Sequence, residues 1–452
     1  MPAKRAPVLI SVIIPVRNGE RELERCLAAL AQSDFADYEC IVVDDGSTDG
    51  SAAVAERHGC RLIRCPSRGP AAARNLGARE ACGRILFFID ADVCVHPDSL
   101  SRVAENFAGD RALDAVIGSY DDSPESPDFL SQYKNLMHCF VHQAGNEAAS
   151  TFWSGCGAIR REIFEKYSGF NEDYQRPAIE DIELGYRLTA AGRKILLDKN
   201  LRVKHLKAWS FWRLLKTDIF DRGIPWTELI LRDANMPNDL NVQISQRISV
   251  ALVYIMLGAV GAMAVHFKGL FLVPLLLLLV LLLSGYWFHE WRASGQRVRL
   301  LVPIAGLFGA SIYFAWRHHM LALIPPLAVT LALIYLQHRF LEGSRSARIY
   351  SFLTGICLAG TIVFILSFMP YHPMIILPFV ILMLVLFINS QFYIFLQGRK
   401  NFLFALTAIP FHLLYHFYNG ISFCAGMLLY WTRRKPASLP AKPASRRADP
   451  VK

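Results

Sequence analysis

The sequence predicts two unlike halves: an N-terminal α/β domain built on a mostly parallel sheet, and an all-α bundle of transmembrane helices after it. Three observations support this. The chain has 452 residues, more than one ordinary core accommodates. Strand-like and helix-like segments alternate through the first 90 residues. Charge is concentrated before residue 245, and Leu, Ile, Val, Phe and Ala dominate from Ile248 onward. The composition changes near residues 235–246.

Local patterns define the elements of the first half. Short apolar runs rich in β-branched residues predict buried strands, and apolar residues at helical spacing predict helices. Strands are expected at 8–16, 38–43, 61–64 and 85–89, and helices at 21–32, 51–58 and 71–80. Strands that alternate with helices form βαβ units, so the sheet should be mostly parallel.

Polar segments follow three of these strands: Pro15–Glu20, Asp44–Asp49 and Asp90–Asp92. Open α/β sheets bind ligands at the carboxyl ends of their strands, so these segments should line one crevice. Neither a GxGxxG nor a GxxxxGK[ST] pattern follows a strand. The sequence therefore does not indicate a dinucleotide site or a P-loop.

The triplet Asp90-Ala91-Asp92 is the most chemically specific of these segments. Two carboxylates directly after a buried strand are costly unless a cation meets them. A hard divalent ion that also binds phosphate oxygens is the natural partner, and a solvated acidic turn is the alternative. The neighbouring acidic turn at Asp44-Asp45 favours the ion.

Five ordered motifs resemble the family-2 glycosyltransferases of the GT-A (Rossmann-like) fold. They are Ser11-Val-Ile-Ile-Pro-Val-Arg-Asn, Val43-Asp-Asp-Gly-Ser-Thr-Asp, Ala73-Arg-Asn-Leu-Gly, Phe88-Ile-Asp-Ala-Asp and Ile179-Glu-Asp-Ile-Glu-Leu-Gly-Tyr-Arg-Leu. The resemblance covers residues 8–210, and it implies transfer of a sugar from a nucleotide-diphosphate sugar.

The resemblance also implies roles for single residues. The nucleotide-binding residues would be Pro15, Asn18, Asp44, Asp45, Arg74, Asn75 and Asp90. Asp90 and Asp92 match the metal-diphosphate motif for Mg²⁺ or Mn²⁺, with Asp92 the more direct ligand. Asp181 matches the catalytic base, and Glu180 is the next candidate. Acceptor attack on an anomeric carbon needs such a base and a charge sink for the diphosphate.

Three further assignments have structural alternatives. Glu180 and Asp181 would also suit the N-terminus of a helix. Trp153, Gly155 and Gly157 suggest a loop whose backbone approaches the acceptor closely, although an ordinary strand turn has the same pattern. His205 is a candidate third metal or diphosphate ligand, but a lone His after a strand is often structural.

The remaining chain predicts membrane association. After an extension (1–7) and the GT-A domain (8–235), a transmembrane domain is expected over 236–431, with spans at 248–265, 269–288, 300–316, 320–336, 349–369 and 374–396. The basic-aromatic segment 205–235 suits a membrane interface. Segment 402–431 is either an interfacial helix or a seventh span, and the basic tail 432–452 is expected to be disordered.

Charge predicts the orientation. Loops 289–299, 338–348 and 397–400 are basic and alternate with less charged ones, which places them with the N-terminal domain on the cytoplasmic side of the cytoplasmic membrane. No signal peptide is recognised, and the ten cysteines are expected to be reduced. The net charge of +10 comes largely from the tail, which favours a membrane surface over nucleic acid.

The expected function is an inverting glycosyltransferase that acts on a lipid-linked or membrane-proximal acceptor in cell-envelope glycan or glycolipid synthesis. A processive polysaccharide synthase is one alternative, but the Gln-x-x-Arg-Trp motif of such family members is missing. A transporter or lipid translocator with a degenerate sugar-binding domain is another. The intact Asp90, Asp92 and Asp181 argue against degeneracy.

Overall fold

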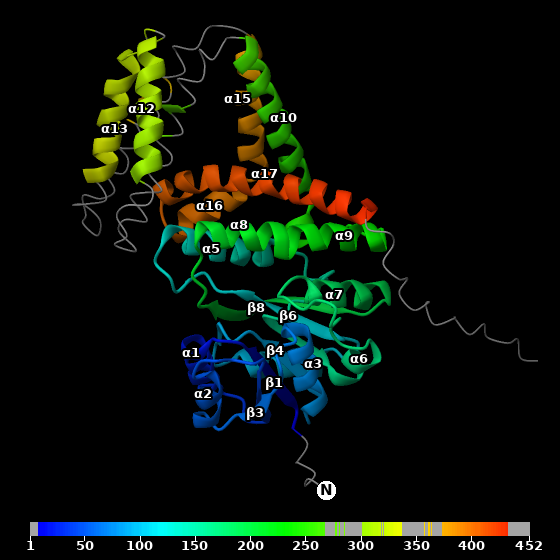
Figure 1. Ribbon diagram of the computed structural model, residues 1–452. Coiled ribbons are helices and arrows are strands. Elements are labelled where there is room, and N and C mark those ends of the chain that lie inside the picture. The colour runs from blue at the N-terminus through cyan, green and yellow to red at the C-terminus, as the bar shows by residue number, and fades with distance from the viewer. Residues whose placement is uncertain are drawn as a thin grey trace, which may run out of the picture.

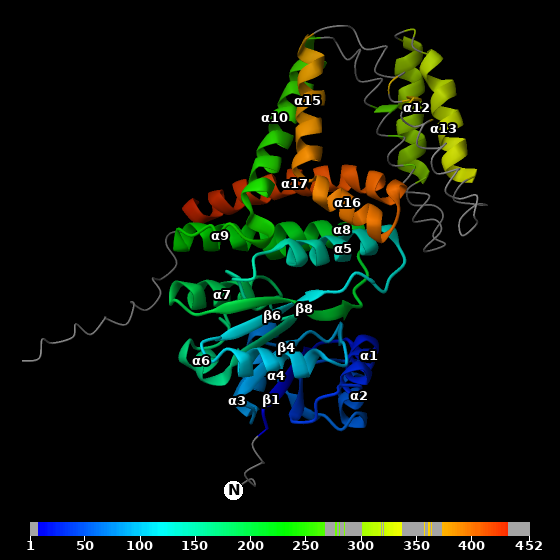
Figure 2. The ribbon, with the colours of Figure 1, turned by 180° about the vertical axis from the view of Figure 1, so that it is seen from behind.

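A computed structural model shows an α/β domain beneath a layer of helices that lie crosswise to further, upright helices (Figures 1 and 2). It describes residues 8–266, 301–317, 321–336 and 373–432, with a few isolated positions between them. Several predicted segments lie outside the described residues, apart from isolated positions. They are the spans at 269–288 and 349–369, the basic loops at 289–299 and 338–348, the extension and nearly all of the tail.

The N-terminal domain contains an eight-stranded mixed sheet with the order β3-β2-β1-β4-β7-β6-β8-β5. The first half, β3 to β4, is parallel, as the βαβ pattern predicts. In the second half β7 runs antiparallel to β4 and β6, and β5 runs antiparallel to β8. The strands are β1 Ile10–Val16, β2 Tyr38–Asp44, β3 Arg61–Arg64, β4 Ile85–Ile89, β5 Val93–Val95, β6 Ala115–Tyr120, β7 Cys156–Arg160 and β8 Ile195–His205.

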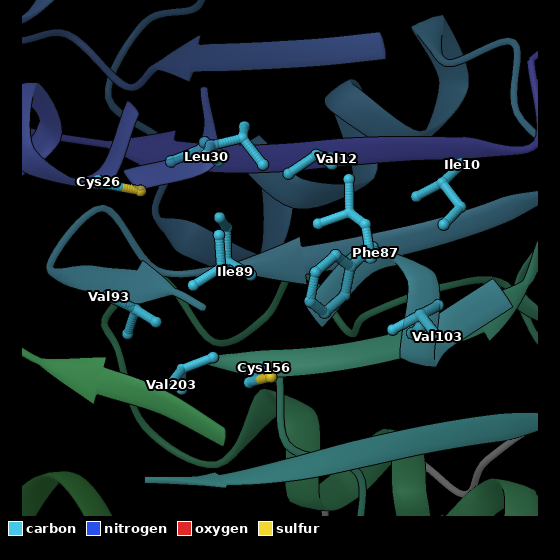
Figure 3. Packing of buried hydrophobic residues seen from close by; sticks show 14 of the residues in the cluster. Ile10, Val12, Cys26, Leu30, Phe87, Ile89, Val93, Val103, Cys156 and Val203 are labelled. Carbon is cyan, nitrogen blue, oxygen red and sulfur yellow. The ribbon is translucent and has the colours of Figure 1, made fainter. Parts of the chain in front are cut away.

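Helices cover both faces of this sheet, so its central strands are apolar on both sides. Val12 and Ile14 of β1 join one core cluster, shown in Figure 3, while Ile13 points into the other. Such burial explains why β1 reads as a continuous apolar run. The helices are α1 Glu20–Leu30, α2 Ser51–Arg57, α3 Pro70–Glu80, α4 Ser99–Gly109, α5 Phe129–Ala144, α6 Arg161–Lys166 and α7 Glu180–Ala190.

After β8 the chain leaves the sheet and forms a crosswise layer of helices. A short α-helix, a π-helical stretch and a second α-helix follow one another as α8 Phe211–Lys216, η1 Thr217–Gly223 and α9 Ile224–Asp233. The later elements are η2 Leu240–Val242, α10 Ile244–His266, α12 Leu301–Arg317, η3 Leu321–Leu323, α13 Ile324–Leu336, α15 Pro373–Ile388, α16 Ser390–Arg399 and α17 Phe402–Thr432.

The two halves share a hydrophobic core at α5. Phe129, Tyr133 and Leu136 of α5 pack in one cluster with residues of α16 and α17, such as Phe392 and Phe411. Phe129 and Phe411 have ring centroids 5.3 Å apart. The composition boundary near residues 235–246 therefore does not separate two independent cores.

The expected spans correspond to the described helices unequally. Only α10, over Ile244–Met263, is a single described helix that is long and apolar enough to cross a membrane. The expected span 374–396 is not one helix, because α15 and α16 meet at an angle of 62°. Asn389 ends the first helix and donates to the Val385 carbonyl and to Ser249 of α10. Its polar interactions at the break account for the bend.

Helix α17 lies in the crosswise layer, and in both views it runs across α10 and α15 (Figures 1 and 2). Gly426 allows close packing on α9, since a Cβ there would come within 2.6 Å of Thr227. A Cβ at Gly420 would likewise collide with Tyr254 of α10. Helix α17 thus packs along both α9 and α10.

Candidate active site

A cleft of about 940 Å³ opens at the carboxyl ends of the parallel strands. Polar segments that are far apart in the sequence meet there because their strands are neighbours. Its lining includes six of the predicted site residues: Pro15, Asn18, Asp45, Arg74, Asp90 and Asp92. The predicted residues Asp44, Asn75, Trp153, Gly155, Gly157, Glu180, Asp181 and His205 do not line this cleft.

The cleft also contains cationic side chains to which the sequence analysis gave no role in binding the donor: Arg17, Arg21, Arg25, Arg176, Lys207 and Arg213. Lys207 and Arg213 follow β8 in the segment that was assigned to the membrane interface. Their position shortly after His205 could have indicated that they belong to the site. The basic-aromatic composition of the segment instead favoured a membrane interface. Together these cations suit the binding of an anionic ligand such as a diphosphate.

Side-chain hydrogen bonds organise the loops after β1 and β2. Asn18 has a left-handed backbone (φ 52°), and its Oδ1 accepts from the Thr48 amide at 2.7 Å. Asp45 accepts from the amides of Arg68 and Gly69 at 2.8 and 3.0 Å. Asp44 instead accepts from the Ser47 amide and serves the turn itself. The two adjacent acids therefore differ, because only Asp45 reaches the cleft.

Arg74 of α3 joins the two acidic motifs. Its Nη2 donates to Asp90 at 2.7 Å and its Nη1 donates to Glu180 at 2.8 Å. Burial opposes the charge, but the Asp90 and Glu180 carboxylates outweigh it, so the pKa of Arg74 is raised. Its buried Nε has no hydrogen-bond partner among the described residues. The Arg74 guanidinium thus holds together the Asp90 and Glu180 motifs, which are far apart in the sequence.

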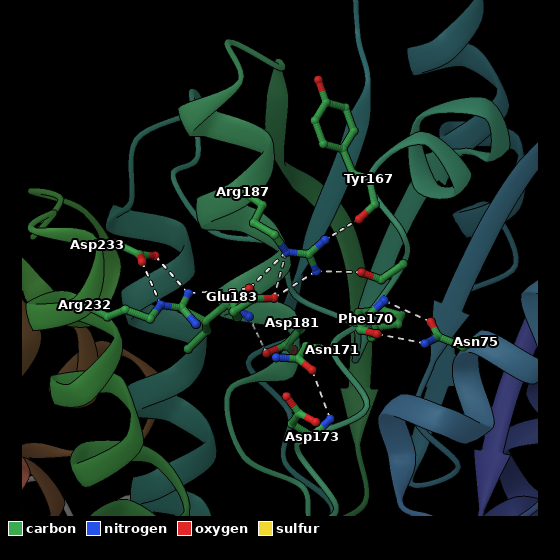
Figure 4. A network of polar contacts seen from close by, with 12 residues as sticks. Asn75, Tyr167, Phe170, Asn171, Asp173, Asp181, Glu183, Arg187, Arg232 and Asp233 are labelled. Carbon is green, nitrogen blue, oxygen red and sulfur yellow. Dashed lines mark hydrogen bonds and ion pairs between the residues drawn. The ribbon is translucent and has the colours of Figure 1, made fainter. Parts of the chain in front are cut away.

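Asn75 does not face the cleft. Its Nδ2 donates to the Phe170 carbonyl at 2.8 Å, and its Oδ1 accepts from the Phe170 amide at 2.9 Å (Figure 4). The side-chain amide also donates to Glu172 at 3.0 Å. These bonds use both ends of the side chain, so Asn75 holds the 170–172 loop, in contrast to the predicted contact with the nucleotide.

A second network anchors α7, the helix of the Glu180-Asp181 motif. The buried Glu183 carboxylate accepts from Arg187 at 2.9 and 3.0 Å and lies 3.5 Å from Arg232 of α9 (Figure 4). Arg187 also donates to the carbonyls of Tyr167 and Gly169. Glu183 and Arg187 belong to the family-like motif but have a structural role. Glu183 connects α7 to α9 of the crosswise layer, and Arg187 connects α7 to the loop at 167–169.

Asp92 pairs with His205 across the antiparallel β5–β8 edge. The His205 Nε2 lies 3.6 Å from Asp92 Oδ2. Burial raises the pKa of Asp92, but the charge of the neighbouring His205 outweighs it, so this pKa is lowered to about 2. On its other side His205 Nδ1 lies 2.8 Å from Asn135 Oδ1, which also accepts from Trp209. Asn135 Oδ1 is an acceptor, so Nδ1 carries the proton and Nε2 faces Asp92.

These side chains fit a divalent ion in part. A carboxylate oxygen and an imidazole nitrogen face each other, and an Asn orients the imidazole, as groups behind the direct ligands do in metal sites. The Asp90, Asp92 and His205 set does not form one three-ligand cluster, since no group of three such side chains with metal-binding geometry occurs in the described part of the chain. Asp90 instead forms an ion pair with Arg74. Asp92 and His205 would hold the ion.

The predicted base and its neighbour have different surroundings. Glu180 is buried and held by Arg74 and the Ala178 amide. Asp181 accepts from the amide and hydroxyl of Ser154, both at 3.0 Å. Burial, and then the Glu180 carboxylate, raise the pKa of Asp181 to about 6. The N-cap of α7 is Ile179, so neither acid is the capping residue of the alternative interpretation.

The Trp153–Gly157 segment is filled by its own side chains. A Cβ on Gly155 would come within 2.7 Å of the Trp153 indole, and one on Gly157 would collide with the Trp153 carbonyl. Trp153 packs edge-on against Tyr120 at 4.7 Å between ring centroids. The glycines therefore allow the chain to pack on itself. Ser154, between them, is the residue that contacts Asp181.

Comparison with known proteins places this geometry in a family. Residues 11–168 match the family model described as "Glycosyl transferase family 2". This match shows a family-2 glycosyltransferase domain over residues 11–168.

Curated relatives are similar over part of their length. The chain is 30% identical over 225 residues to validoxylamine A glucosyltransferase of Streptomyces hygroscopicus subsp. limoneus, which covers 41% of this chain and 48% of the relative. It is 32% identical over 167 residues to undecaprenyl-phosphate 4-deoxy-4-formamido-L-arabinose transferase of Pseudomonas paraeruginosa, which covers 35% and 48%. The chain thus spans about half the length of these curated relatives.

Solved structures are more distant. A mannosyltransferase from Pyrobaculum calidifontis in complex with GDP-Man and Mn²⁺ is 16% identical with a TM-score of 0.37, covering 79% of this chain and 88% of that one.

Proposed function

We propose that this protein is a membrane-associated, inverting glycosyltransferase that moves a sugar from a nucleotide-diphosphate sugar to a lipid-linked acceptor in the synthesis of a cell-envelope glycan or glycolipid. One observation carries the proposal: the cleft of the family-2 domain holds Asp45, Asp90 and Asp92 together with several cationic side chains. Arg74 connects that cleft to the Glu180-Asp181 motif.

The cleft offers matched groups for each part of the donor. Asp45 and Asn18 line the end formed by β1 and β2, where carboxylate and amide oxygens suit the hydroxyl and N–H groups of a nucleoside. Lys207 and Arg213 line the side beside Asp92 and would bind the diphosphate. The sugar would then lie toward Arg74.

The reaction needs a base near the acceptor, and Asp181 suits that role better than Glu180. In the transfer, an acceptor oxygen forms a bond to the anomeric carbon while the bond from that carbon to the diphosphate breaks. The acceptor proton passes to the base, and the nucleoside diphosphate leaves with the electron pair. A base works best with a pKa near the working pH, and the pKa of Asp181 is raised to about 6. Glu180 is already committed to Arg74.

Asp92 and His205 would hold a Mg²⁺ or Mn²⁺ ion, which when bound offsets the charge of the departing diphosphate. Asn135 keeps the His205 Nε2 directed to that position. Arg74 keeps Asp90 at the rim of the same cleft. The protein thus pre-positions its ligands through neighbouring hydrogen bonds.

Membrane association is supported by exposed apolar side chains on the described helices. On α10 and α15, Ile255 is 55% exposed, Ile376 is 52% exposed and Phe387 is 76% exposed. Exposed apolar surface of this extent marks a membrane or protein interface. The similarity to an undecaprenyl-phosphate sugar transferase supports a lipid-linked acceptor. We propose an integral protein of the cytoplasmic membrane with its catalytic domain in the cytoplasm.

A donor screen on purified full-length protein tests the proposed activity. Nucleotide release from UDP- and GDP-sugars would be measured with Mg²⁺ or Mn²⁺, with and without polyprenyl-linked acceptors. We expect release that depends on one donor, on the ion and on the acceptor. Asp92→Ala should abolish metal-stimulated nucleotide binding, while Asp110→Ala, a surface carboxylate outside the cleft, should retain it. Equal donor binding by wild-type protein with and without EDTA would contradict the metal assignment.

Cysteine labelling tests the proposed orientation. A single cysteine at Ser294, Ser344 or Gln397, in a background without the native cysteines, should resist an impermeant reagent applied to intact cells and react after permeabilisation. Labelling of any of the three from outside would contradict the orientation.

A further inference from the structure

A second cavity, of about 590 Å³, lies outside the active-site cleft, between the catalytic domain and the helices above it. Its walls come from α5 below, η1 and α9 on one side, and α10 and α17 above. Figures 1 and 2 show these five elements meeting where the crosswise layer joins the upright α10. None of the residues discussed for the donor lines it.

The cavity has an unbalanced positive charge. Lys134 and Asp218 form a buried ion pair at 2.6 Å, and Tyr418 also donates to Asp218 at 2.5 Å, so this pair is neutral and satisfied. Arg222 lies beside it, and no carboxylate of the described residues is within ion-pair distance of it. Arg222 instead meets His138, with Nη1 and Nε2 3.4 Å apart. A guanidinium without a carboxylate is suited to an anionic ligand.

His416 gives independent evidence for a polar ligand. The residue is fully buried on α17 and lines the cavity, yet neither ring nitrogen has a hydrogen-bond partner among the described residues. A buried polar side chain without any partner is costly and rare in native proteins. A ligand oxygen in the cavity would satisfy it.

Part of the lining is apolar and leads to the exposed apolar surface of α10. Val250, Ala251 and Tyr254 of α10, with Phe423 of α17, form this part. One residue beyond Tyr254, Ile255 is exposed on the outside of the same helix. A ligand that fits both parts of the lining has an anionic head and an apolar chain.

The cavity is also near the proposed base. Trp226 lines it and donates from Nε1 to the Tyr186 hydroxyl at 3.0 Å. Tyr186 and Asp181 lie on the same helix, α7, five residues apart. Five residues of α-helix rise about 7.5 Å, so Tyr186, which contacts the wall residue Trp226, lies less than two turns from Asp181 along α7.

We propose that this cavity binds the phosphate-bearing head of a membrane lipid, with Arg222 and His416 as head-group ligands and the apolar chain leaving along α10. The binding itself is independent of the proposed enzymatic activity. The further step, that the lipid is the acceptor, rests on the proposed function, because a phosphate held here would direct a lipid-linked sugar toward α7.

Binding of defined lipids to the full-length protein in neutral detergent tests the site. Dodecyl phosphate and dioctanoyl phosphatidic acid would be titrated separately, with dodecanol and inorganic phosphate as probes that lack the head or the chain. We expect both lipid phosphates to bind more tightly than either partial probe. Arg222→Gln should weaken this binding at least about tenfold, as expected for loss of one charge-assisted hydrogen bond. Lys216→Gln, an exposed cation in α8 outside the cavity, is the matched control.

His416→Phe provides a second test, because it keeps a ring of similar size and removes both nitrogens. It should also weaken binding of the lipid phosphates while leaving UDP binding to the cleft unchanged. Wild-type affinity in both Arg222→Gln and His416→Phe would overturn the site. Displacement of the lipid by UDP would overturn it too, since it would place the lipid in the cleft. A failure of donor turnover with intact lipid binding would instead contradict only the enzymatic proposal.

The two lipid probes separate the sources of the head group. Tighter binding of the single-chain phosphate supports a site for a lipid-linked acceptor, whereas equal binding supports a site for bilayer phospholipid. Either result retains the cavity as a lipid-phosphate site.

Discussion

Two adjacent carboxylates, Glu180 and Asp181, have different properties because each meets a different partner. Glu180 accepts from Arg74, a cation, and forms a buried ion pair with it. Asp181 accepts from the neutral Ser154 and lies next to the Glu180 charge, so its pKa is raised to about 6. The sequence places both acids at the start of a helix and assigns Arg74 to the nucleotide, but it does not predict that Arg74, 106 residues earlier, pairs with Glu180.

The change Asp181→Asn should separate catalysis from folding. Loss of a general base typically lowers turnover by about 10²–10⁴. The donor dissociation constant should stay within a few-fold, because Asp181 does not line the donor cleft. The wild-type rate should rise with pH through about 6 as the carboxylate ionises. Steady-state transfer and nucleotide-binding assays across pH 5 to 8 measure these effects. Near-normal turnover in Asp181→Asn would place the base elsewhere, with Glu180 the next candidate.

The same variant should stabilise the fold at neutral pH. Asp181 releases its proton near its ordinary pKa of 3.8 when unfolded, but keeps it to about pH 6 when folded. Between these values the folded state binds more protons, so the free energy of unfolding falls as the pH rises. The uncharged amide introduced by Asp181→Asn avoids this cost. Thermal unfolding should therefore show Asp181→Asn as more stable than wild type at pH 7 and similar to it near pH 4.

Asn135 should act as a positioning residue for His205. It accepts from His205 Nδ1 at 2.8 Å and donates to the Lys207 carbonyl at 3.1 Å, so it orients a proposed metal ligand and a cleft segment together. Loss of such an outer partner typically lowers metal affinity by about 10–100-fold. We expect this loss of Mn²⁺ affinity in Asn135→Ala, measured by titration, and partial recovery in Asn135→Asp. Unchanged Mn²⁺ affinity would show that His205 is not a ligand.

Motif residues meet in the cleft where their strands are parallel neighbours in the sheet. Asp45, Asp90 and Asp92 meet in the cleft because β2, β1 and β4 are parallel neighbours, as the alternating pattern predicts. Asn75 lies one position after Arg74 on α3 and consequently on another face of that helix. A motif match assigned both to the nucleotide, but helical geometry separates them.

At the scale of elements, the parallel half of the sheet could be predicted and the antiparallel half could not. Strands β1 to β4 alternate with helices in sequence. Strand β7, in contrast, inserts between β4 and β6 although it comes after both. That pairing depends on contacts between segments that are far apart in the chain. Local periodicity has no signal for it, and the same holds for the pairing of β5 with β8.

Helix α5 is the element that connects the two halves, and a buried ion pair fixes it. Lys134 of α5 and Asp218 of η1 are 2% and 5% exposed, respectively. Lys134→Met should leave an uncompensated buried carboxylate and destabilise the protein by about 3–5 kcal/mol. The double variant Lys134→Met with Asp218→Leu should recover much of this loss. Thermal unfolding in detergent measures both changes.

A surface pair provides the control for this prediction. Lys194 and Asp110 also form an ion pair at 2.5 Å, but their side chains are 57% and 38% exposed. Lys194→Met should therefore change the unfolding temperature little. If Lys134→Met were equally mild, the buried pair would not be what fixes α5 to η1.

At the scale of the whole molecule, the sequence predicts an α/β domain followed by a helix bundle, and in the structure the two share a hydrophobic core. Composition marks residues 235–246 as a boundary because charge density changes there. Contacts nevertheless join residues on the two sides of that boundary. Helix α5 packs with α16 and α17, and Arg399 of α16 pairs with Asp122 at 2.7 Å. Such long-range packing has no signature in composition, which reports on the surroundings of a segment but not on its partners.

The joint core predicts that the catalytic domain is not an independent unit. A fragment ending at residue 235 would keep the sheet but lose α16 and α17, and would expose Phe129, Tyr133 and Leu136 on α5. Exposed contiguous apolar surface of this kind promotes association. We expect the fragment to aggregate in the absence of detergent. Its oligomeric state should be measured beside that of the full-length protein in the same detergent. Replacing those three side chains with Ser, Gln and Lys should restore solubility, because the sheet has its own two core clusters. A soluble, monomeric, nucleotide-binding fragment with the native α5 would contradict the joint core and would show that α16 and α17 only rest on the domain.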